Sequence, residues 1–220
     1  MLDAVIFDMD GTIVDSLEMW SNAGSVYLAS HGKEAEADLA YKMDTLTEVE
    51  TAQLFQEEYG IDLSVEEILA EMEEQLYQYY STDVKLKPGA REFIKAIDDL
   101  GIKIALATVT NRRSADAALK TTGIEPYFDA SRVVAEVGVG KEEPKIYLDL
   151  AKELDADPQK TFVFEDSLYA AKTAKEADFY LVGKYDRLHD FYQDELKEIS
   201  DYYLKDFRDS AELLNIIKNY

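Results

Sequence analysis

Two acidic side chains stand close together at the end of an apolar run near the start of the chain. Residues 5–7 are typical of a buried strand, yet they lead directly to Asp8 and Asp10, and Gly11 and Thr12 follow at once. Strand interiors rarely contain carboxylates, because a buried charge is costly unless it is paired or binds a metal. The pair therefore indicates a site that needs concentrated negative charge.

Further polar candidates follow other strand-like runs. In an open parallel sheet, ligands bind beyond the carboxyl ends of the strands, so side chains at those ends meet at one edge. A threonine-containing turn follows residues 102–108, a glycine turn with a lysine follows residues 132–135, and two acids close residues 161–165 and the turn after them. The candidate site residues are Asp8, Asp10, Thr108, Thr110, Lys141, Glu165 and Asp166.

Four carboxylates at one edge would repel one another, and a hard divalent cation would remove that cost. Mg²⁺ prefers oxygen ligands and keeps coordination positions open for a phosphate oxygen. The two histidines, His31 and His189, are not at predicted strand ends and are expected at the surface, which argues against a histidine-rich zinc site. Lys141 would neutralise a carboxylate and a phosphate together, and Thr108 would donate a hydrogen bond to phosphate.

The elements that must position these residues alternate between strand and helix. Such alternation favours βαβ units and a mostly parallel sheet. We predict an α/β fold with a Rossmann-like parallel sheet core and helices on both faces. The predicted strands are residues 2–8, 102–108, 132–135, 161–165, 179–182 and a weaker 201–204, and the predicted helices are residues 88–100, 113–122, 144–154, 167–177 and 210–217.

One segment, residues 15–84, breaks this alternation because it has helical patterns and no good strand. Helices are predicted over residues 47–59 and 64–80, and Ser64 and Glu67 have the spacing of a capping box. We therefore expect a catalytic core of residues 1–14 and 85–220 and an inserted helical-bundle cap domain of residues 15–84.

The composition excludes several classes of function. The 46 acidic and 23 basic residues give the 220-residue chain a net charge of −23, so we expect no binding to nucleic acid or to a membrane surface. The chain has no cysteine, which excludes disulfides and thiolate chemistry. No apolar run is long enough to span a bilayer, and the acidic start does not resemble a signal peptide. We expect a cytoplasmic protein that is a monomer or a weak dimer.

The candidate residues at the four strand ends, in this order, resemble the four motifs of the haloacid dehalogenase-like hydrolase superfamily. The resemblance is closest to the phosphatases of that superfamily with a helical cap. DMDGT at Asp8 matches the first motif, Thr108 the second, Lys141 in GKEEPKIY the third and VFEDS at Glu165 the fourth. The third motif departs from the family pattern at Glu142 and Glu143. Lys145, one helical turn after Lys141, competes for the lysine role.

The resemblance implies a mechanism in which Asp8 forms an aspartyl-phosphate and Asp10 acts as acid and base. It also implies Mg²⁺ held by Asp8, the backbone carbonyl of Asp10 and Asp166, with Glu165 beside or among these ligands. Phosphate would be bound by Thr108 and Lys141. Thr110 either contacts phosphate as well or only stabilises its turn.

The leading hypothesis is therefore a Mg²⁺-dependent phosphatase acting on a small phosphomonoester, for example a sugar phosphate. The first alternative is a phosphosugar mutase of the β-phosphoglucomutase type. Those mutases carry a histidine where this chain has Trp20 and an arginine in the cap, and residues 15–84 contain no arginine. A phosphonate hydrolase would need a cap lysine such as Lys33 or Lys42. A relative that only binds phosphate compounds is the third possibility.

Overall fold

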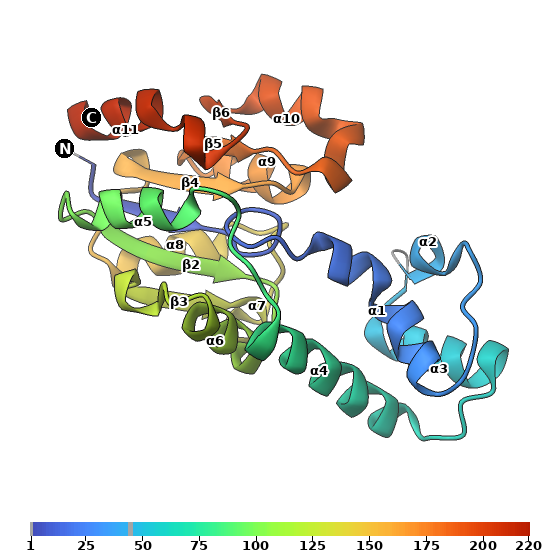
Figure 1. Cartoon of the computed structure of the whole chain (residues 1–220). Coiled ribbons are helices and arrows are strands. Elements are labelled where there is room, and N and C mark those ends of the chain that lie inside the picture. Colours follow the sequence, from blue (N-terminus) through green and yellow to red (C-terminus); the bar gives the residue numbers. More distant parts are fainter. Residues whose placement is uncertain (1, 44–45) are drawn as a thin grey trace. The chain divides into compact units, whose positions relative to one another are not determined.

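The structure is a computed structural model that describes residues 2–43 and 46–220. The chain forms two compact units (Figure 1). The α/β unit comprises the first 16 residues together with Val84–Tyr220, and the helical unit comprises Leu17–Asp83. Among the described residues, no helix is both long and apolar enough to cross a membrane.

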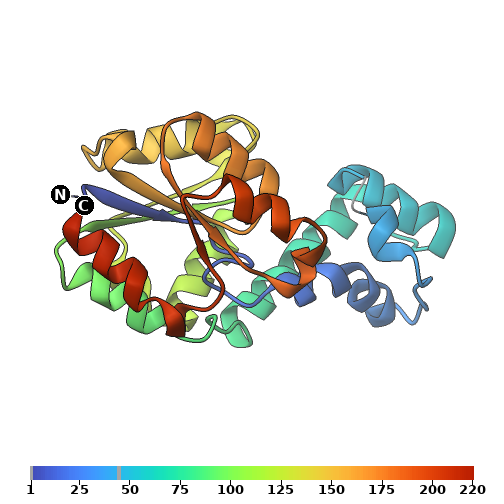
Figure 2. The same cartoon turned by 90° about the horizontal axis from the view of Figure 1, so that it is seen from above.

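The α/β unit is built on a parallel sheet of six strands in the order β3-β2-β1-β4-β5-β6. Helices cover both faces of this sheet (Figure 2), so the predicted Rossmann-like fold is confirmed. The strands are β1 (Ala4–Phe7), β2 (Lys103–Thr108), β3 (Ala130–Val133), β4 (Thr161–Glu165), β5 (Tyr180–Lys184) and β6 (Tyr202–Leu204).

The helices of this unit lie between the strands, close to their predicted positions. The predicted helices are α5 (Ala90–Asp98), α6 (Arg112–Thr121), α8 (Lys145–Glu153), α9 (Leu168–Glu176) and α11 (Ala211–Asn219). The structure adds α7 (Val134–Val137) and α10 (Gln193–Ile199), which were not predicted. The prediction of a strand over residues 132–135 was wrong in its second half. Val134 and Ala135 begin α7, which ends at Val137 and is followed by Gly138 with a positive φ of 80°. β-branched residues favoured a longer strand locally, but the chain turns here toward Lys141.

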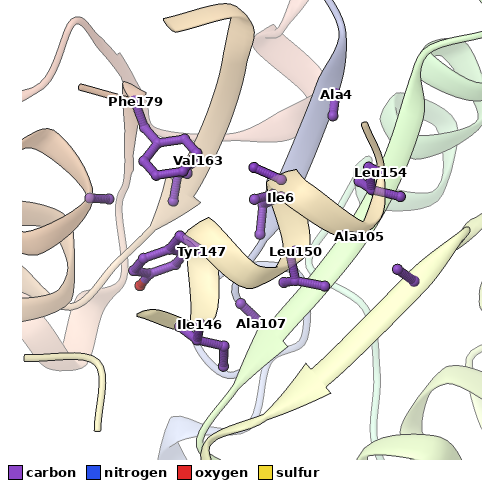
Figure 3. Packing of buried hydrophobic residues seen from close by; sticks show 13 residues of the cluster. Ala4, Ile6, Ala105, Ala107, Ile146, Tyr147, Leu150, Leu154, Val163 and Phe179 are labelled. Carbon is purple, nitrogen blue, oxygen red and sulfur yellow. The ribbon is translucent and has the colours of Figure 1, made fainter. Parts of the chain in front are cut away.

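The core of the α/β unit explains why its strands are apolar on both faces. Ile6 of β1, Ala105 of β2 and Val163 of β4 pack with Ile146 and Leu150 of α8 on one side of the sheet (Figure 3). On β1, β2 and β4 almost every side chain is buried. Parallel sheets covered by helices have such continuous apolar strands, and this rigid packing fixes the positions of the residues that follow each strand.

The helical unit has its own apolar core. Its helices are α1 (Leu17–Ser30), α2 (Leu39–Met43), α3 (Glu48–Tyr59) and α4 (Val65–Thr82). Tyr27, Leu28, Phe55 and Ile68 are among its buried residues, and the rings of Tyr27 and Phe55 stack at 5.2 Å. The capping box predicted at Ser64 is present at the start of α4, and Thr47 forms a second one at α3.

Candidate active site

The register of the sheet brings two acids from distant parts of the sequence to the same level. Phe7 of β1 is paired with Phe164 of β4, so the next residues, Asp8 and Glu165, lie side by side at the carboxyl edge. The amide of Asp8 donates to the carbonyl of Phe164 at 2.9 Å, which holds the end of β1 against β4. Both side chains are buried.

A tight turn after Asp8 places the second acid of the motif. Gly11 has a φ of 81°, a conformation that is costly for residues with a side chain. Its amide donates to the carbonyl of Val14, and the amides of Ile13 and Val14 both donate to the carbonyl of Met9. The turn folds the chain back at the sheet edge and leaves Asp10 9% exposed.

Lys141 connects the two acids at the end of β1 and β4. Its Nζ lies 2.5 Å from Asp8 Oδ1 and 2.5 Å from Glu165 Oε1, and the lysine is only 2% exposed. Tyr147 on α8 donates its hydroxyl to the same Glu165 oxygen at 2.6 Å. Lys145, the competing lysine, lies on the surface and pairs with Asp149. The structure thus brings Lys141, and not Lys145, to the acidic cluster.

Burial and neighbouring acids favour the protonated forms of Asp8 and Glu165, and Lys141 opposes this effect. Burial raises the pKa of Asp8 well above its ordinary value, the charge of Glu165 adds to that effect, and Lys141 opposes it. Burial likewise raises the pKa of Glu165, again opposed by Lys141. Burial alone would lower the pKa of Lys141, but the charges of Asp8 and Glu165 raise it. Lys141 thus offsets only part of the cost of burying these carboxylates, and a bound divalent cation would favour their ionised forms further.

Asp166 follows Glu165 and is held by two side chains from other segments. Thr12 donates its hydroxyl to Asp166 Oδ1 at 2.9 Å, and His189 Nδ1 lies 2.9 Å from Asp166 Oδ2. His189 was expected at the surface; its side chain is half-buried, at 26% exposure, and it contacts this buried acid. His189 lies beyond β5 in a turn without strand or helix periodicity, so no pattern in the sequence pointed to it.

Asp10 has a different environment, made of hydroxyl groups. Ser16 donates to Asp10 Oδ1 and Thr110 donates to Asp10 Oδ2, each at 2.6 Å. Thr108 Oγ1 accepts a hydrogen bond from the amide of Thr110 at 3.0 Å. Thr110, expected to contact phosphate or to stabilise its turn, thus contacts the acid. Sequence reasoning missed Ser16; its only signal was a hydroxyl residue six positions after Asp10.

The cluster suits a hard divalent cation. One oxygen each from Asp8, Glu165 and Asp166 lie within 4.8 Å of one another, and all three residues are buried. Glu165 Oε2 is buried and has no hydrogen-bond partner among the described residues. Buried carboxylate oxygens are costly when unpaired. A donor set made only of oxygens fits Mg²⁺ better than zinc.

Comparison with known proteins agrees with this geometry. A sequence model of the haloacid dehalogenase-like hydrolases matches residues 2–178. The chain is 34% identical over 176 residues to a phosphorylated carbohydrates phosphatase of Thermotoga maritima, covering 80% of this chain and 82% of that protein. It is 35% identical over 188 residues to (DL)-glycerol-3-phosphatase 2 of Arabidopsis thaliana, covering 81% and 77%.

Among solved structures, a Thermotoga maritima protein provisionally described as a β-phosphoglucomutase superposes with a TM-score of 0.82 and 31% identity, over 99% of both chains. The CbbY protein of Rhodobacter sphaeroides in complex with phosphate has a TM-score of 0.76 and 23% identity, which shows a common fold. The resemblance indicated by the four motifs is confirmed: this chain belongs to the haloacid dehalogenase-like hydrolase family.

Proposed function

We propose that the protein is a phosphatase that hydrolyses a small phosphomonoester, with phosphorylated carbohydrates as the leading substrate class. The observation that carries the proposal is the position of Lys141 between Asp8 and Glu165, beside Asp166. A phosphate dianion next to Asp8 needs this positive charge. Two relatives above 30% identity are named as phosphatases of small phosphorylated compounds.

In the first step, a carboxylate oxygen of Asp8 attacks the substrate phosphorus. The new bond joins Asp8 to phosphorus, and the bond from phosphorus to the leaving oxygen breaks. Asp10 in its protonated form gives its proton to that oxygen, so the alcohol leaves neutral. Lys141 stays beside Asp8 and offsets the charge of the transferring group.

In the second step, water hydrolyses the aspartyl-phosphate. Asp10, now ionised, takes a proton from the water as the water oxygen bonds to phosphorus, and the bond from phosphorus to Asp8 breaks. Inorganic phosphate leaves and Asp10 is protonated again. The hydroxyls of Ser16 and Thr110 suit both states of Asp10, because a hydroxyl donates to a carboxylate and accepts from a carboxylic acid.

Mg²⁺ would be held by Asp8, Asp166 and the backbone carbonyl of Asp10, with Glu165 beside or among the ligands. Bound there, it would neutralise charge on the transferring phosphoryl group. The net charge of −23 favours a small-molecule substrate over nucleic acid or a membrane surface. We further propose that residues 15–84 act as a cap domain and that the protein is a cytoplasmic monomer or weak dimer.

A mutase remains the second candidate, because a solved relative at 31% identity carries a provisional β-phosphoglucomutase description. Trp20 argues against it. The mutases resemble this chain at the first motif, but they carry a histidine at the position of Trp20. A histidine can both accept and donate a proton. The indole of Trp20 only donates, and it donates to the hydroxyl of Tyr80 at 2.9 Å within the helical unit.

The test measures phosphate release from a panel of phosphomonoesters, with Mg²⁺ and with EDTA. Asp8→Asn should abolish release, and Asp149→Asn, which removes an acid paired with the surface Lys145, should leave it unchanged. Conversion of β-glucose 1-phosphate to glucose 6-phosphate without phosphate release would replace the proposal by the mutase. Release that persists in Asp8→Asn would contradict the proposed nucleophile.

A further inference from the structure

Of the three acids that could hold a cation together, Asp8, Glu165 and Asp166, Asp166 has contacts from other side chains on both of its oxygens. Thr12 holds one oxygen and His189 the other, each at 2.9 Å, and the two partners come from separate segments of the chain. By contrast, both partners of Glu165, Lys141 and Tyr147, contact the same oxygen. Two contacts on different oxygens fix both the position and the rotation of the Asp166 carboxylate.

These contacts leave Asp166 able to bind a cation. A carboxylate oxygen accepts more than one contact, so each oxygen of Asp166 keeps a lone pair. A carboxylate that holds a divalent cation is ionised and only accepts hydrogen bonds. His189 Nδ1 must therefore carry the proton and donate it. Such donors to metal-binding groups orient the ligand and raise its affinity for the metal.

The His189 ring is itself well supported. It lies in the segment Arg187–Tyr192, where two short 3₁₀ turns meet at a kink at His189. The amide of His189 donates to the carbonyl of Asp186, and its carbonyl accepts from the side chain of Gln193. The ring of Tyr192 lies 5.0 Å from the His189 ring, and its hydroxyl donates to the Asp166 carbonyl at 3.3 Å. These contacts hold the backbone and the ring of His189 in place. The imidazole therefore loses little conformational entropy when it contacts Asp166.

The beginning of the turn is anchored by a buried ion pair. Asp186 is 2% exposed and accepts hydrogen bonds from Lys87 and, at 2.7 Å, from the amide of Leu188. The ion pair attaches the beginning of the turn to Lys87, in the segment before α5, and it does not involve Asp166. The position of His189 is thus set by the fold and does not depend on the acid that it contacts.

We infer that His189 is a positioning residue that holds Asp166 in the orientation in which it binds the divalent cation. The inference rests on the proposed function in one respect, namely that the acidic cluster is a cation site. Partners of this kind typically change metal affinity by about 10- to 100-fold. We expect loss of the His189 contact to weaken cation binding about 10-fold, with little effect on folding.

The test measures binding of Mg²⁺ to the full chain by calorimetry, and of Mn²⁺ by electron paramagnetic resonance, without substrate. The Asn side chain carries an amide nitrogen near the place of Nδ1, whereas Gln carries it near the place of Nε2. His189→Ala and His189→Gln should therefore weaken binding about 10-fold, and His189→Asn should restore most of it. His31→Ala is the control, because His31 has similar exposure and contacts Glu71 in the helical unit.

The variants also separate positioning from general support of the fold. If His189→Ala binds Mg²⁺ as tightly as the wild type, the inference is wrong. It is also wrong if His189→Asn and His189→Gln bind equally weakly, because the defect then does not depend on a donor at Nδ1. Should the Ala variant unfold, Thr12→Val removes the contact to the other oxygen of Asp166. Unchanged Mg²⁺ affinity in that variant would contradict the claim that restraint of the Asp166 carboxylate supports cation binding.

The result is distinguishable from failure of the proposed function. A wild type that binds Mg²⁺ but hydrolyses no ester would refute the phosphatase and leave the role of His189 intact. A wild type that hydrolyses esters in EDTA and binds no Mg²⁺ would refute the inference and the Mg²⁺ site, and would leave the phosphatase reaction standing. In an active enzyme, His189→Ala should raise the Mg²⁺ concentration needed for half-activation while leaving the KM for the ester at saturating Mg²⁺ unchanged.

Discussion

The α/β unit and the helical unit differ in where they place charge. At the carboxyl edge of its sheet, the α/β unit buries Asp8, Lys141, Glu165 and Asp166. Among the described residues of the helical unit, no charged side chain is buried to this extent. Its ion pairs, such as that of Lys42 with Glu36, remain partly or largely exposed. Buried charges cost stability unless they are paired, and in the α/β unit Lys141 pairs with two of these acids while the buried Asp186 pairs with Lys87.

Removal of the positive charge of Lys141 should have the largest effect on stability and activity. In Lys141→Met, Asp8 and Glu165 lose their buried partner, and breaking such a contact lowers the free energy of unfolding by about 3–5 kcal/mol. Loss of a group that stabilises the transferring charge should lower kcat at least about 100-fold. Urea unfolding and steady-state kinetics measure the two effects.

Lys145→Met is the matched control, because Lys145 also pairs with an acid but on the surface. It should unfold at nearly the wild-type urea concentration and keep its activity. Equal losses in the two lysine variants would remove the distinction between buried and exposed charge on which the comparison depends.

The second prediction concerns pH and Mg²⁺. Burial and neighbouring acids raise the pKa of Asp8, and burial raises that of Glu165, so the folded chain binds these protons more tightly than the unfolded chain. Without a divalent cation, the cluster's contribution to stability therefore falls as pH rises above about 4 toward the folded pKa values. Mg²⁺ binds the ionised acids and should offset this loss.

We therefore expect Mg²⁺ to raise the thermal midpoint more at pH 8 than at pH 5. Binding at a hundredfold excess over Kd corresponds to about 2.7 kcal/mol, and competing protons reduce it at the lower pH. Differential scanning fluorimetry at both pH values measures the shift. Asp166→Asn should lose most of it. An equal shift at both pH values would show that Mg²⁺ acts elsewhere on this acidic surface.

The same difference between the units determines what could be predicted from the sequence. Asp8, Lys141, Glu165 and Asp166 were found because they follow apolar strands, where an acid or a lysine is out of place. The strand order and register then brought them together. Ser16 and His189 were missed, since a serine after a turn and a histidine in an irregular segment are ordinary in sequence. Only tertiary contacts with Asp10 and Asp166 distinguish them.

In the helical unit, local rules predicted structure but not chemistry. The spacing of Ser64 and Glu67 predicted the start of α4, because a capping box depends only on neighbours. The indole of Trp20 donates a hydrogen bond to the hydroxyl of Tyr80, sixty residues away. Such a contact depends on how helices pack, which no short motif encodes.

The third prediction tests this local contribution. Ser64→Ala removes the side chain that accepts from the amide of Glu67 at the start of α4. Loss of an N-cap of this kind costs about 1 kcal/mol. We expect a modest fall in the urea midpoint and no change in Mg²⁺ binding, which depends on the other unit. Ser21→Ala, within α1, is the control and should not destabilise the chain. A loss of Mg²⁺ affinity in Ser64→Ala would contradict this independence.

The smallest effect is expected at the most charge-rich contact of the helical unit. Lys42 Nζ lies 2.8 Å from Glu36 and 3.3 Å from Glu58, yet its side chain is 31% exposed and the two acids are more so. Solvent-exposed pairs contribute little, because water screens them and ordering long side chains costs entropy. Lys42→Ala should therefore leave the urea midpoint within error of the wild type at 0.15 M salt. A loss as large as that of Lys141→Met would mean that the number of acids around a lysine, and not its burial, sets the contribution of the pair.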